Sequence, residues 1–430
     1  MDASPTQPPT ADRRALDRLK LTRLNTLLAE ILPANRFYAA RFGDHPLPLA
    51  SLAELEELAF TTKADLVEGF GDSGMANQTW PAERYVRFHQ TSGSHGRPLP
   101  VWDTAADWQW WMTCWQTIYE RAGLQPGEGV FVAASFGPYI GFWSGFDAAV
   151  AAGGRAIPTG GLSTSARLQL LQVTGPALLL ATPSYALRLA EVAAETGVDT
   201  ARSTVRCVIV AGEPGGSTPA VRARIATAWG AAVLDHAGAT EIGPWGVGSP
   251  AGPGLEVIED WFHPEFLAVE SGKPAASGEL AELVLTTLGR AGCPVIRYRT
   301  GDVVRPRWPT ATEVAAGASP WVQLEGGILG RTDDMLVIRG VNIFPSAIEN
   351  IVRGFPEVAE YRLTVSHQGS LDRLRLAIED RLEEPARVAQ ELQLRLGLRV
   401  DVELAPPGSL PRFEGKGRRV IDDRDAPKPG

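Results

Sequence analysis

The stretch GRTDDMLVIRGVNIFPSAIE, residues 330–349, divides the chain into two parts. Its first five residues are polar and rich in turn formers, which is typical of a hinge between folded units. Beyond the hinge, strand-like and helix-like apolar patterns alternate, and they predict an α+β unit of about 100 residues, large enough to fold alone. Its expected strands are 335–340, 360–366, 373–379 and 399–405, and its expected helices are 345–355 and 384–397.

Upstream of the hinge, short apolar runs alternate with amphipathic stretches. This alternation predicts a parallel sheet whose two faces are both covered by helices. Closer to the hinge, 278–287 and 294–304 alternate polar and apolar residues, as antiparallel or barrel strands do. The expected parallel strands are 130–135, 177–181, 205–211 and 232–236, and the expected helices are 165–173, 184–196 and 218–229.

The N-terminal region has its own pattern. Residues 1–13 are polar and rich in proline, so we expect a disordered tail. Leucine spacing predicts a helix over 15–32, and Ser51 with Glu54 predicts a capping box at the start of a second, short helix. The fold class is therefore α/β: a large N-terminal domain over 14–332 with mixed and parallel sheets, and a small mobile α+β lid over 333–430.

Composition excludes several classes of protein. The chain has 41 Lys and Arg against 50 Asp and Glu, a formal net charge of −9, which argues against a nucleic-acid partner. The most apolar stretch, 131–154, contains Asp147 and Pro138, so it predicts a buried strand, loop and helix rather than a membrane span.

The cysteines and the N-terminus indicate the compartment. The three cysteines lack metal-ligand spacing and cannot build a disulfide framework, so we expect buried free thiols. With no signal-peptide pattern at the N-terminus, these features predict a cytoplasmic protein. The cysteines are Cys114, Cys207 and Cys293.

One segment after an expected strand has the composition of an anion-binding loop. Small hydroxylated residues and glycines let the backbone bend and direct N–H and O–H groups at a phosphate. No Walker A sequence follows, and a plain Ser/Gly turn explains the segment equally well. Its residues are Thr91, Ser92, Gly93, Ser94, His95 and Gly96, followed by Arg97 and Pro98.

Three further positions carry candidate chemistry. Thr240 and Glu241 follow the expected strand 232–236, where a hydroxyl and a carboxylate suit a Mg²⁺–phosphate site; a helix N-cap is the alternative. Asp302, at the end of YRTGD, can accept both hydroxyls of a ribose, or it is a surface turn. Lys416 lies in the glycine-flanked loop PRFEGKGRRV, which can reach a phosphate or is a solvated basic loop.

The order and spacing of these segments resemble the phenylacetate-CoA ligase family. That family belongs to the adenylate-forming superfamily of acyl-CoA synthetases, adenylation domains and luciferases. The resemblance runs from FTTKADL at 60–66 to Val420, and the hinge stretch at 330–349 is its most specific part. AGEPGG at 211–216, VIRYRTGD at 295–302 and the EGK loop at 414–416 agree with it.

The resemblance implies a reaction, cofactors and residue roles. A carboxylic acid reacts with ATP, in the presence of Mg²⁺, to give an acyl-AMP and pyrophosphate, and coenzyme A then takes the acyl group. By resemblance, Lys416, Glu241 and Thr240 are catalytic, Glu241 holds Mg²⁺, the 91–96 loop binds phosphates, and Asp333 is the hinge. The nucleotide-binding residues are Gly212, Glu213, Pro214, Asp235, His236, Ala237, Asp302 and Arg331, and the coenzyme A loop carries Arg339, Gly340 and Asn342.

An aromatic-rich acid pocket is expected between 135–143, the segment after Ala211 and the loop 238–245. Flat apolar walls favour an aromatic or planar acid, although such rings are as often core residues. The pocket residues are Phe136, Tyr139, Phe142, Trp143, Ala211, Gly238, Pro244 and Trp245.

Two departures from the family pattern leave alternatives open. His95 stands where a threonine is usual, and Ala237 stands where an aromatic ring usually stacks on adenine. We therefore expect a specialised member, in secondary metabolism, that uses an acid other than phenylacetate. The acceptor is alternatively a carrier-protein thiol or an amine, and a non-catalytic nucleotide-binding relative is a further alternative. A homodimer is expected from the resemblance alone.

Overall fold

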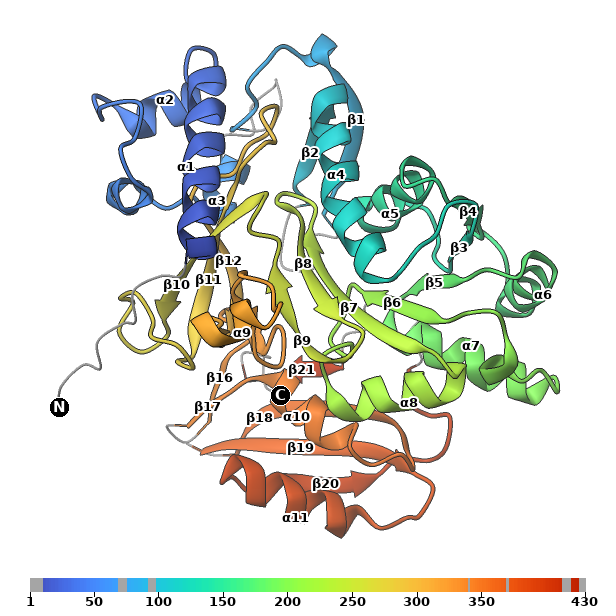
Figure 1. Cartoon of the computed structure of the whole chain (residues 1–430). Helices are drawn as coiled ribbons and strands as arrows, with labels where there is room; N and C mark the ends of the chain where they lie inside the picture. Colours follow the sequence, from blue (N-terminus) through green and yellow to red (C-terminus); the bar gives the residue numbers. More distant parts are fainter. Residues whose placement is uncertain are drawn as a thin grey trace.

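The structure of the protein is a computed structural model that describes residues 11–68, 76–91, 98–338, 341–368, 371–411 and 419–424. The first helix, α1 (Ala11–Ile31), begins earlier than expected, so residues 11–13 are helical rather than disordered. The reason is a long-range contact, because Arg13 pairs with the buried Glu259. α2 (Arg36–Phe42) follows, and both helices lie at the upper left of Figure 1.

The expected helix after Ser51 is a short 3-10 helix, Leu52–Glu57. The predicted capping box is wrong: Ser51 makes no side-chain cap, and Glu54 Oε2 instead accepts a hydrogen bond of 3.0 Å from the backbone N–H of Ala50. The other short helices of this region are α3 (Lys63–Glu68) and a 3-10 turn, Ala82–Arg84.

The main sheet has nine strands in the order β13-β14-β9-β8-β7-β6-β5-β3-β4. β3 to β7 pair in parallel, and β7, β8 and β9 pair antiparallel. The predicted mixture of parallel and antiparallel strands is confirmed. The strands are β3 (Gly129–Val132), β4 (Arg155–Pro158), β5 (Leu178–Ala181), β6 (Cys207–Ala211), β7 (Ala232–Ala239), β8 (Gly243–Ser249), β9 (Gly252–Val257), β13 (Pro306–Arg307) and β14 (Gln323–Leu324).

Helices cover both faces of the parallel strands, as predicted. In β3, Val130 and Val132 pack in the cluster on the side of α4 and α5, whereas Phe131 packs in the cluster of the opposite face. This alternation follows from the period of 2 in a strand, and burial on both faces explains the almost uninterrupted apolar runs. The covering helices are α4 (Ala105–Arg121) and α5 (Ile140–Ala151) on one face, and α6 (Thr164–Thr174), α7 (Pro183–Glu195) and α8 (Pro219–Trp229) on the other.

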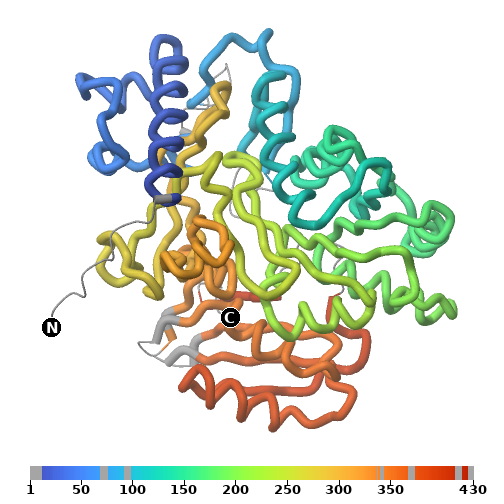
Figure 2. Tube along the Cα trace, in the orientation of Figure 1, coloured from blue at the N-terminus to red at the C-terminus, as the bar shows by residue number. Residues whose placement is uncertain are grey.

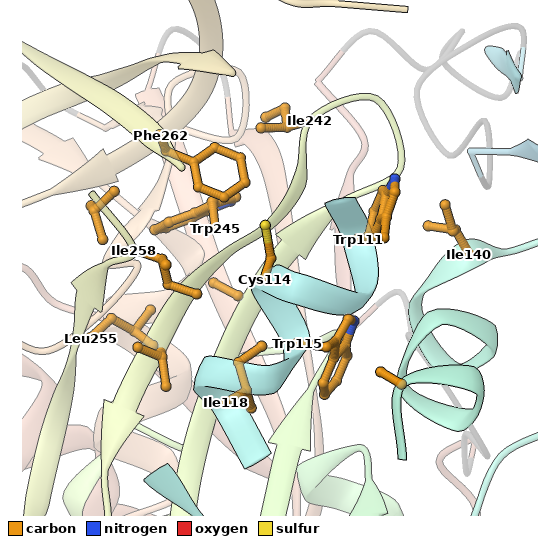
Figure 3. Close-up of a cluster of buried hydrophobic side chains, with 14 of the residues drawn as sticks. Trp111, Cys114, Trp115, Ile118, Ile140, Ile242, Trp245, Leu255, Ile258 and Phe262 are labelled. Carbon is orange, nitrogen blue, oxygen red and sulfur yellow. The ribbon is translucent and has the colours of Figure 1, made fainter. Parts of the chain in front are cut away.

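The tryptophan-rich helix α4 is the centre of the larger core. Thr104 and Asp107 form a capping box at its start, which defines where the helix begins. Figure 3 shows Trp111, Cys114 and Trp115 of this helix among buried side chains from β8 and β9. Because these rings are buried, the stretch 108–115 serves packing. Cys114, Cys207 and Cys293 are all buried and unpaired, as expected.

Two smaller sheets complete the N-terminal part. One has the order β10-β11-β12-β15, all antiparallel, and the other is the hairpin β1–β2, which precedes α4. These elements matter for the site because the loop 91–99 joins β1 to β2. The strands are β1 (Tyr85–Gln90), β2 (Pro100–Thr104), β10 (Phe262–Ala268), β11 (Ala281–Thr287), β12 (Tyr298–Val304) and β15 (Gly330–Arg331); a 3-10 turn, Thr200–Arg202, and α9 (Ala311–Ala315) lie in connections.

The C-terminal part has its own four-stranded sheet, β20-β19-β18-β21, and its own apolar core. It lies below the main sheet in Figures 1 and 2. Every predicted element of this part is present. The elements are β16 (Leu336–Ile338), β17 (Val341–Ile343), α10 (Pro345–Val352), β18 (Val358–Gln368), β19 (Leu371–Asp380), α11 (Pro385–Leu396), β20 (Asp401–Leu404) and β21 (Val420–Asp422).

Hydrogen bonds between described residues tie α10 to the large part. Thr218 Oγ1, at the start of α8, donates to Asn350 Oδ1 at 2.8 Å, and Ser346 Oγ donates to the carbonyl of Leu329. The described helices are all too short or too polar to cross a membrane.

Candidate active site

Hydrogen bonds join the two ends of the loop that was predicted to bind phosphate. Thr91 N–H donates to the carbonyl of Leu99 at 3.0 Å, and Leu99 N–H donates to Thr91 Oγ1 at 2.9 Å. Ser92, Gly93, Ser94, His95 and Gly96 lie outside the described residues. Just before the loop, Gln90 N–H donates to the carbonyl of Pro138 at 2.8 Å, which brings the expected acid-pocket segment beside the hairpin.

Thr240 and Glu241 lie directly after β7, in a turn that leads into β8, and both are partly buried. The phenol of Tyr298, on β12, donates to Glu241 Oε1 at 3.0 Å. The guanidinium of Arg290 donates through Nη1 to the carbonyls of Thr240 and Glu241, at 3.2 and 2.9 Å. The carboxylate and the backbone of Glu241 are therefore each held by a separate side chain.

Asp235, His236 and Ala237 are buried residues of β7. His236 Nδ1 lies 2.8 Å from the carbonyl of Gly246, its ring lies 4.5 Å from the ring of Trp115, and burial lowers its pKa to about 4. Ala237 is opposite Gly246 of β8 and brings no ring to the site. Asp235 Oδ2 accepts a hydrogen bond from Ser217 Oγ, so this carboxyl ties β7 to the segment before α8.

Replacing Asp235 by asparagine tests the charge state of this buried carboxyl. Burial raises its pKa to about 6, and the Ser217 hydrogen bond offsets only part of that shift. Between about pH 4 and 6 the carboxyl of Asp235 is protonated in the folded protein but ionised in the unfolded chain. The contribution of Asp235 to the free energy of unfolding therefore falls by about 3 kcal/mol as the pH rises through this range. Asparagine has no such titration. We expect the melting temperature of Asp235→Asn, relative to the parent, to increase from pH 4 to pH 7; a pH-independent difference would contradict the assignment.

Asp302 and the hinge residues form one ion-pair group. Asp302 lies opposite Arg331 in the pairing of β12 with β15, and Arg331 Nη1 lies 3.2 Å from Asp302 Oδ1. Arg331 also pairs with Asp333, with Nε 2.8 Å from Oδ1. The structure thus brings the residue expected to bind ribose together with the expected hinge residue.

The segment expected to line adenine follows β6. Gly212 has a φ of +91°, a conformation that favours glycine, and Gly212 and Pro214 are exposed. Glu213 Oε1 accepts a hydrogen bond of 2.7 Å from the backbone N–H of Ser184, at the start of α7. This bond attaches the loop to a helix N-terminus, where a carboxylate is favoured.

The rings expected in the acid pocket divide into two groups. Phe136 lies 4.7 Å from Trp143, whose Nε1 donates to the carbonyl of Gly137, and both rings are partly exposed, as is Phe142. Tyr139 is 51% exposed, whereas Trp245 is 1% exposed and lies in the core of Figure 3. In the remaining positions, Ala211 and Gly238 are accessible and Pro244 is buried.

Besides the residues of the 91–96 loop, four expected residues fall wholly or partly outside the described part of the chain. Lys416, Arg339 and Gly340 lie outside the described residues, and only the backbone of Asn342, in β17, is described. Among the described residues, no group of three or more His, Cys, Asp or Glu side chains could hold a metal ion.

Comparison with known proteins identifies the family. Residues 340–424 match the model of the AMP-binding enzyme C-terminal domain. The chain is 32% identical over 435 residues to the phenylacetate-coenzyme A ligase of Escherichia coli K12, an alignment that covers 97% of each chain. The chain belongs to the phenylacetate-CoA ligase family.

Two solved structures of one CoA ligase are similar to this family member. A 2-hydroxyisobutyryl-CoA ligase in the postadenylation state, in complex with 2-HIB-AMP, superimposes with a TM-score of 0.88 at 28% identity, over 99% of this chain and 95% of that chain. For the same ligase in the thioesterification state, with 2-HIB-AMP and CoA, the TM-score is 0.70 at 29% identity, over 99% and 96%. The structure of this chain therefore superimposes more fully on the postadenylation state of that ligase than on its thioesterification state.

The structure adds residues that the motifs did not single out. Arg290 and its partner Asp103 were not predicted, and Tyr298 was noted only as part of the YRTGD stretch. Each contacts the 240–241 turn or its support from a distant position in the sequence, so no local pattern marks it. The signal that could have been used is that Tyr298 lies on the same strand as Asp302.

Proposed function

We propose that this ligase activates an aromatic or planar carboxylic acid and transfers its acyl group to coenzyme A. Family membership over 97% of the chain gives the reaction class: the protein is an AMP-forming acid–CoA ligase. A carboxylate oxygen attacks the α-phosphorus of ATP, and the bond to pyrophosphate breaks. The thiol sulfur of coenzyme A then attacks the acyl carbon, loses its proton, and AMP leaves with the oxygen that linked it to the acyl group.

The turn at Thr240 and Glu241 supports a role in the first step. Attack of an anion on a triphosphate is opposed by charge, so the site needs groups that offset it. Glu241 is the carboxylate that would hold Mg²⁺, and a single carboxylate fits this ion, which commonly takes one or two carboxylates together with substrate phosphates. When bound, the ion neutralises phosphate charge. We assign Thr240 to the α-phosphate and Asp302, with Arg331, to the ribose.

The proposal for the acid rests on the partly exposed rings beside the hairpin. The ring centroids of Phe136 and Trp143 are 4.7 Å apart, and both residues lie in the segment that Pro138 ties to β1. Stacked and edge-on contacts with such rings favour a flat, apolar acid. Trp245, buried in the core, is better placed to support the wall than to touch the acid.

The lid supplies the remaining groups in this proposal. Lys416 bridges the acid carboxylate and ATP phosphates in the first step, and the loop with Arg339, Gly340 and Asn342 shapes the thiol tunnel in the second. Asp333, paired with Arg331 at the boundary between β15 and β16, is the point about which the lid turns. Such a rotation lets one site catalyse two reactions.

The cellular setting belongs to the same proposal. Three buried, unpaired cysteines support a reducing compartment such as the cytoplasm. We propose a homodimer, which light scattering of the purified protein tests. The alanine at position 237, in place of a stacking ring, supports a specialised role in secondary metabolism.

A panel of acids tests the proposed substrate class. The purified protein is incubated with Mg-ATP, coenzyme A and aryl, heteroaryl and short aliphatic acids, and the products are identified by mass spectrometry. We expect an acyl-CoA with AMP from a planar or aromatic acid. Acyl-CoA from aliphatic acids alone would overturn the acid class, and acyl-AMP that is consumed only by a holo-carrier protein or an amine would overturn the acceptor.

A further inference from the structure

A buried arginine connects two parts of the proposed ATP site. Arg290 and Asp103 are both 0% exposed, and Arg290 Nε and Nη2 lie 2.8 and 2.7 Å from Asp103 Oδ1. Asp103 belongs to β2, the strand that follows the 91–99 loop. On its other side, the same guanidinium donates through Nη1 to the carbonyls of Thr240 and Glu241, at 3.2 and 2.9 Å.

We propose that Arg290 is a positioning residue that holds the Thr240–Glu241 turn at a set place relative to the hairpin carrying the phosphate loop. The proposal rests on the proposed function, because it assumes that this turn faces the triphosphate. Arg290 itself touches no reacting atom in this account. It acts through the backbone of Glu241 and through Asp103.

Stability alone gives a weak reason for such an arrangement. The cost of removing two charges from water commonly offsets the attraction inside a buried ion pair. The planar guanidinium, in contrast, carries five N–H donors in a fixed geometry, so it can serve a carboxylate on one side and two carbonyls on the other. A lysine ammonium keeps the charge but lacks this fork. The geometry therefore explains why an arginine stands here.

Tyr298 completes the positioning of Glu241 from the side-chain end. Its ring is 2% exposed, and its phenol donates to Glu241 Oε1 at 3.0 Å. Arg290 thus orients the backbone of the turn and Tyr298 orients the carboxylate. Replacing a group that orients a metal-binding carboxylate in this way commonly lowers metal affinity or activity by about 10–100-fold.

A second buried ion pair offers a matched control. Lys20, on α1, lies 2.6 Å from Glu259, and both side chains are 0% exposed. This pair anchors α1, and within the described part of the chain its side-chain hydrogen bonds and ion pairs go to Arg13, Asp17 and Val322, none of which is assigned to the site. Substitution of Lys20 reports what the loss of a buried cation does to stability without changing the 240–241 turn.

The experiment compares full-length Arg290→Lys with Lys20→Met. It measures pyrophosphate exchange with an accepted acid, the melting temperature, and the calorimetric Kd of ATP with Mg²⁺ and with EDTA. For Arg290→Lys we expect pyrophosphate exchange to fall by about 10–100-fold. The preference for Mg-ATP over metal-free ATP should also fall, and the KM of the acid should stay unchanged. Lys20→Met should lower the melting temperature and leave the other values as in the parent.

Tyr298→Phe keeps the proposal testable if Arg290→Lys does not fold. This variant removes one hydroxyl, and we expect a reduced preference for Mg-ATP at a melting temperature close to that of the parent. A preference for Mg-ATP that is unchanged in every folded variant would overturn the proposal. The parent protein could instead be inactive and still prefer Mg-ATP, while the variants lose that preference. This result would overturn the proposed function but not the positioning role.

Discussion

Replacing Glu241 by glutamine is expected to reduce pyrophosphate exchange by at least about 100-fold, the range seen when one preorganised electrostatic group of an active site is removed. The side chain keeps its shape, and its remaining amide oxygen can still accept the hydrogen bond from Tyr298. Only the negative charge is lost. Exchange with an accepted acid at saturating Mg-ATP measures the effect, and titration with Mg²⁺ shows whether the metal requirement rises.

Glu256→Gln is the matched control for this prediction. Glu256 lies on β9, pairs with Arg121 at 2.9 Å, and has no assigned role in the site. We expect its activity to stay near that of the parent. Equal exchange in Glu241→Gln and Glu256→Gln, with both proteins folded, would remove Glu241 from the proposed metal site.

Replacing Lys416 by alanine is expected to abolish the first step and to leave the second. Without the ammonium, the repulsion between the acid carboxylate and the triphosphate is no longer offset, and a loss of at least about 100-fold in adenylation follows. In the thioester step the nucleophile attacks the acyl carbon, so no carboxylate has to approach a triphosphate. When synthetic acyl-AMP is supplied with coenzyme A, we therefore expect acyl-CoA formation close to the parental rate.

Lys273→Ala provides the comparison, because Lys273 is exposed in the connection between β10 and β11. It should leave both steps unchanged. Full adenylation by Lys416→Ala would contradict the assigned role. Loss of both steps to the same degree would also contradict it, since the lysine is proposed to act in one conformation of the lid only.

Elements with buried, regular patterns were predictable from the sequence. The apolar runs of β3, β5, β6 and β7 and the helices between them are found within a few residues of their expected positions. The start of α1 was not predictable, because it depends on the pairing of Arg13 with Glu259, which lies 246 positions away. The capping box predicted at Ser51 is absent for a local reason, since Glu54 accepts a hydrogen bond from the backbone of Ala50 instead.

The candidate site was predictable where the chemistry is carried by residues next to one another in the chain. Thr240 and Glu241 stand at the end of β7, and Asp302 and Arg331 are paired across neighbouring strands. The supports of these residues were not predictable. Arg290 reaches Glu241 from a position 49 residues away, and a single arginine in a loop has no pattern that distinguishes it. Trp245 resembled a pocket residue because it follows a glycine-rich turn, but a central strand places it in the core.

Isotope transfer tests whether the acid passes through an acyl-adenylate before it reaches coenzyme A. An accepted acid labelled with ¹⁸O in both carboxylate positions is converted in one turnover with Mg-ATP and coenzyme A, and the AMP is analysed by mass spectrometry. We expect one ¹⁸O atom in each AMP, because the attacking carboxylate oxygen leaves with the phosphate. Unlabelled AMP, or ADP in place of AMP, would contradict it.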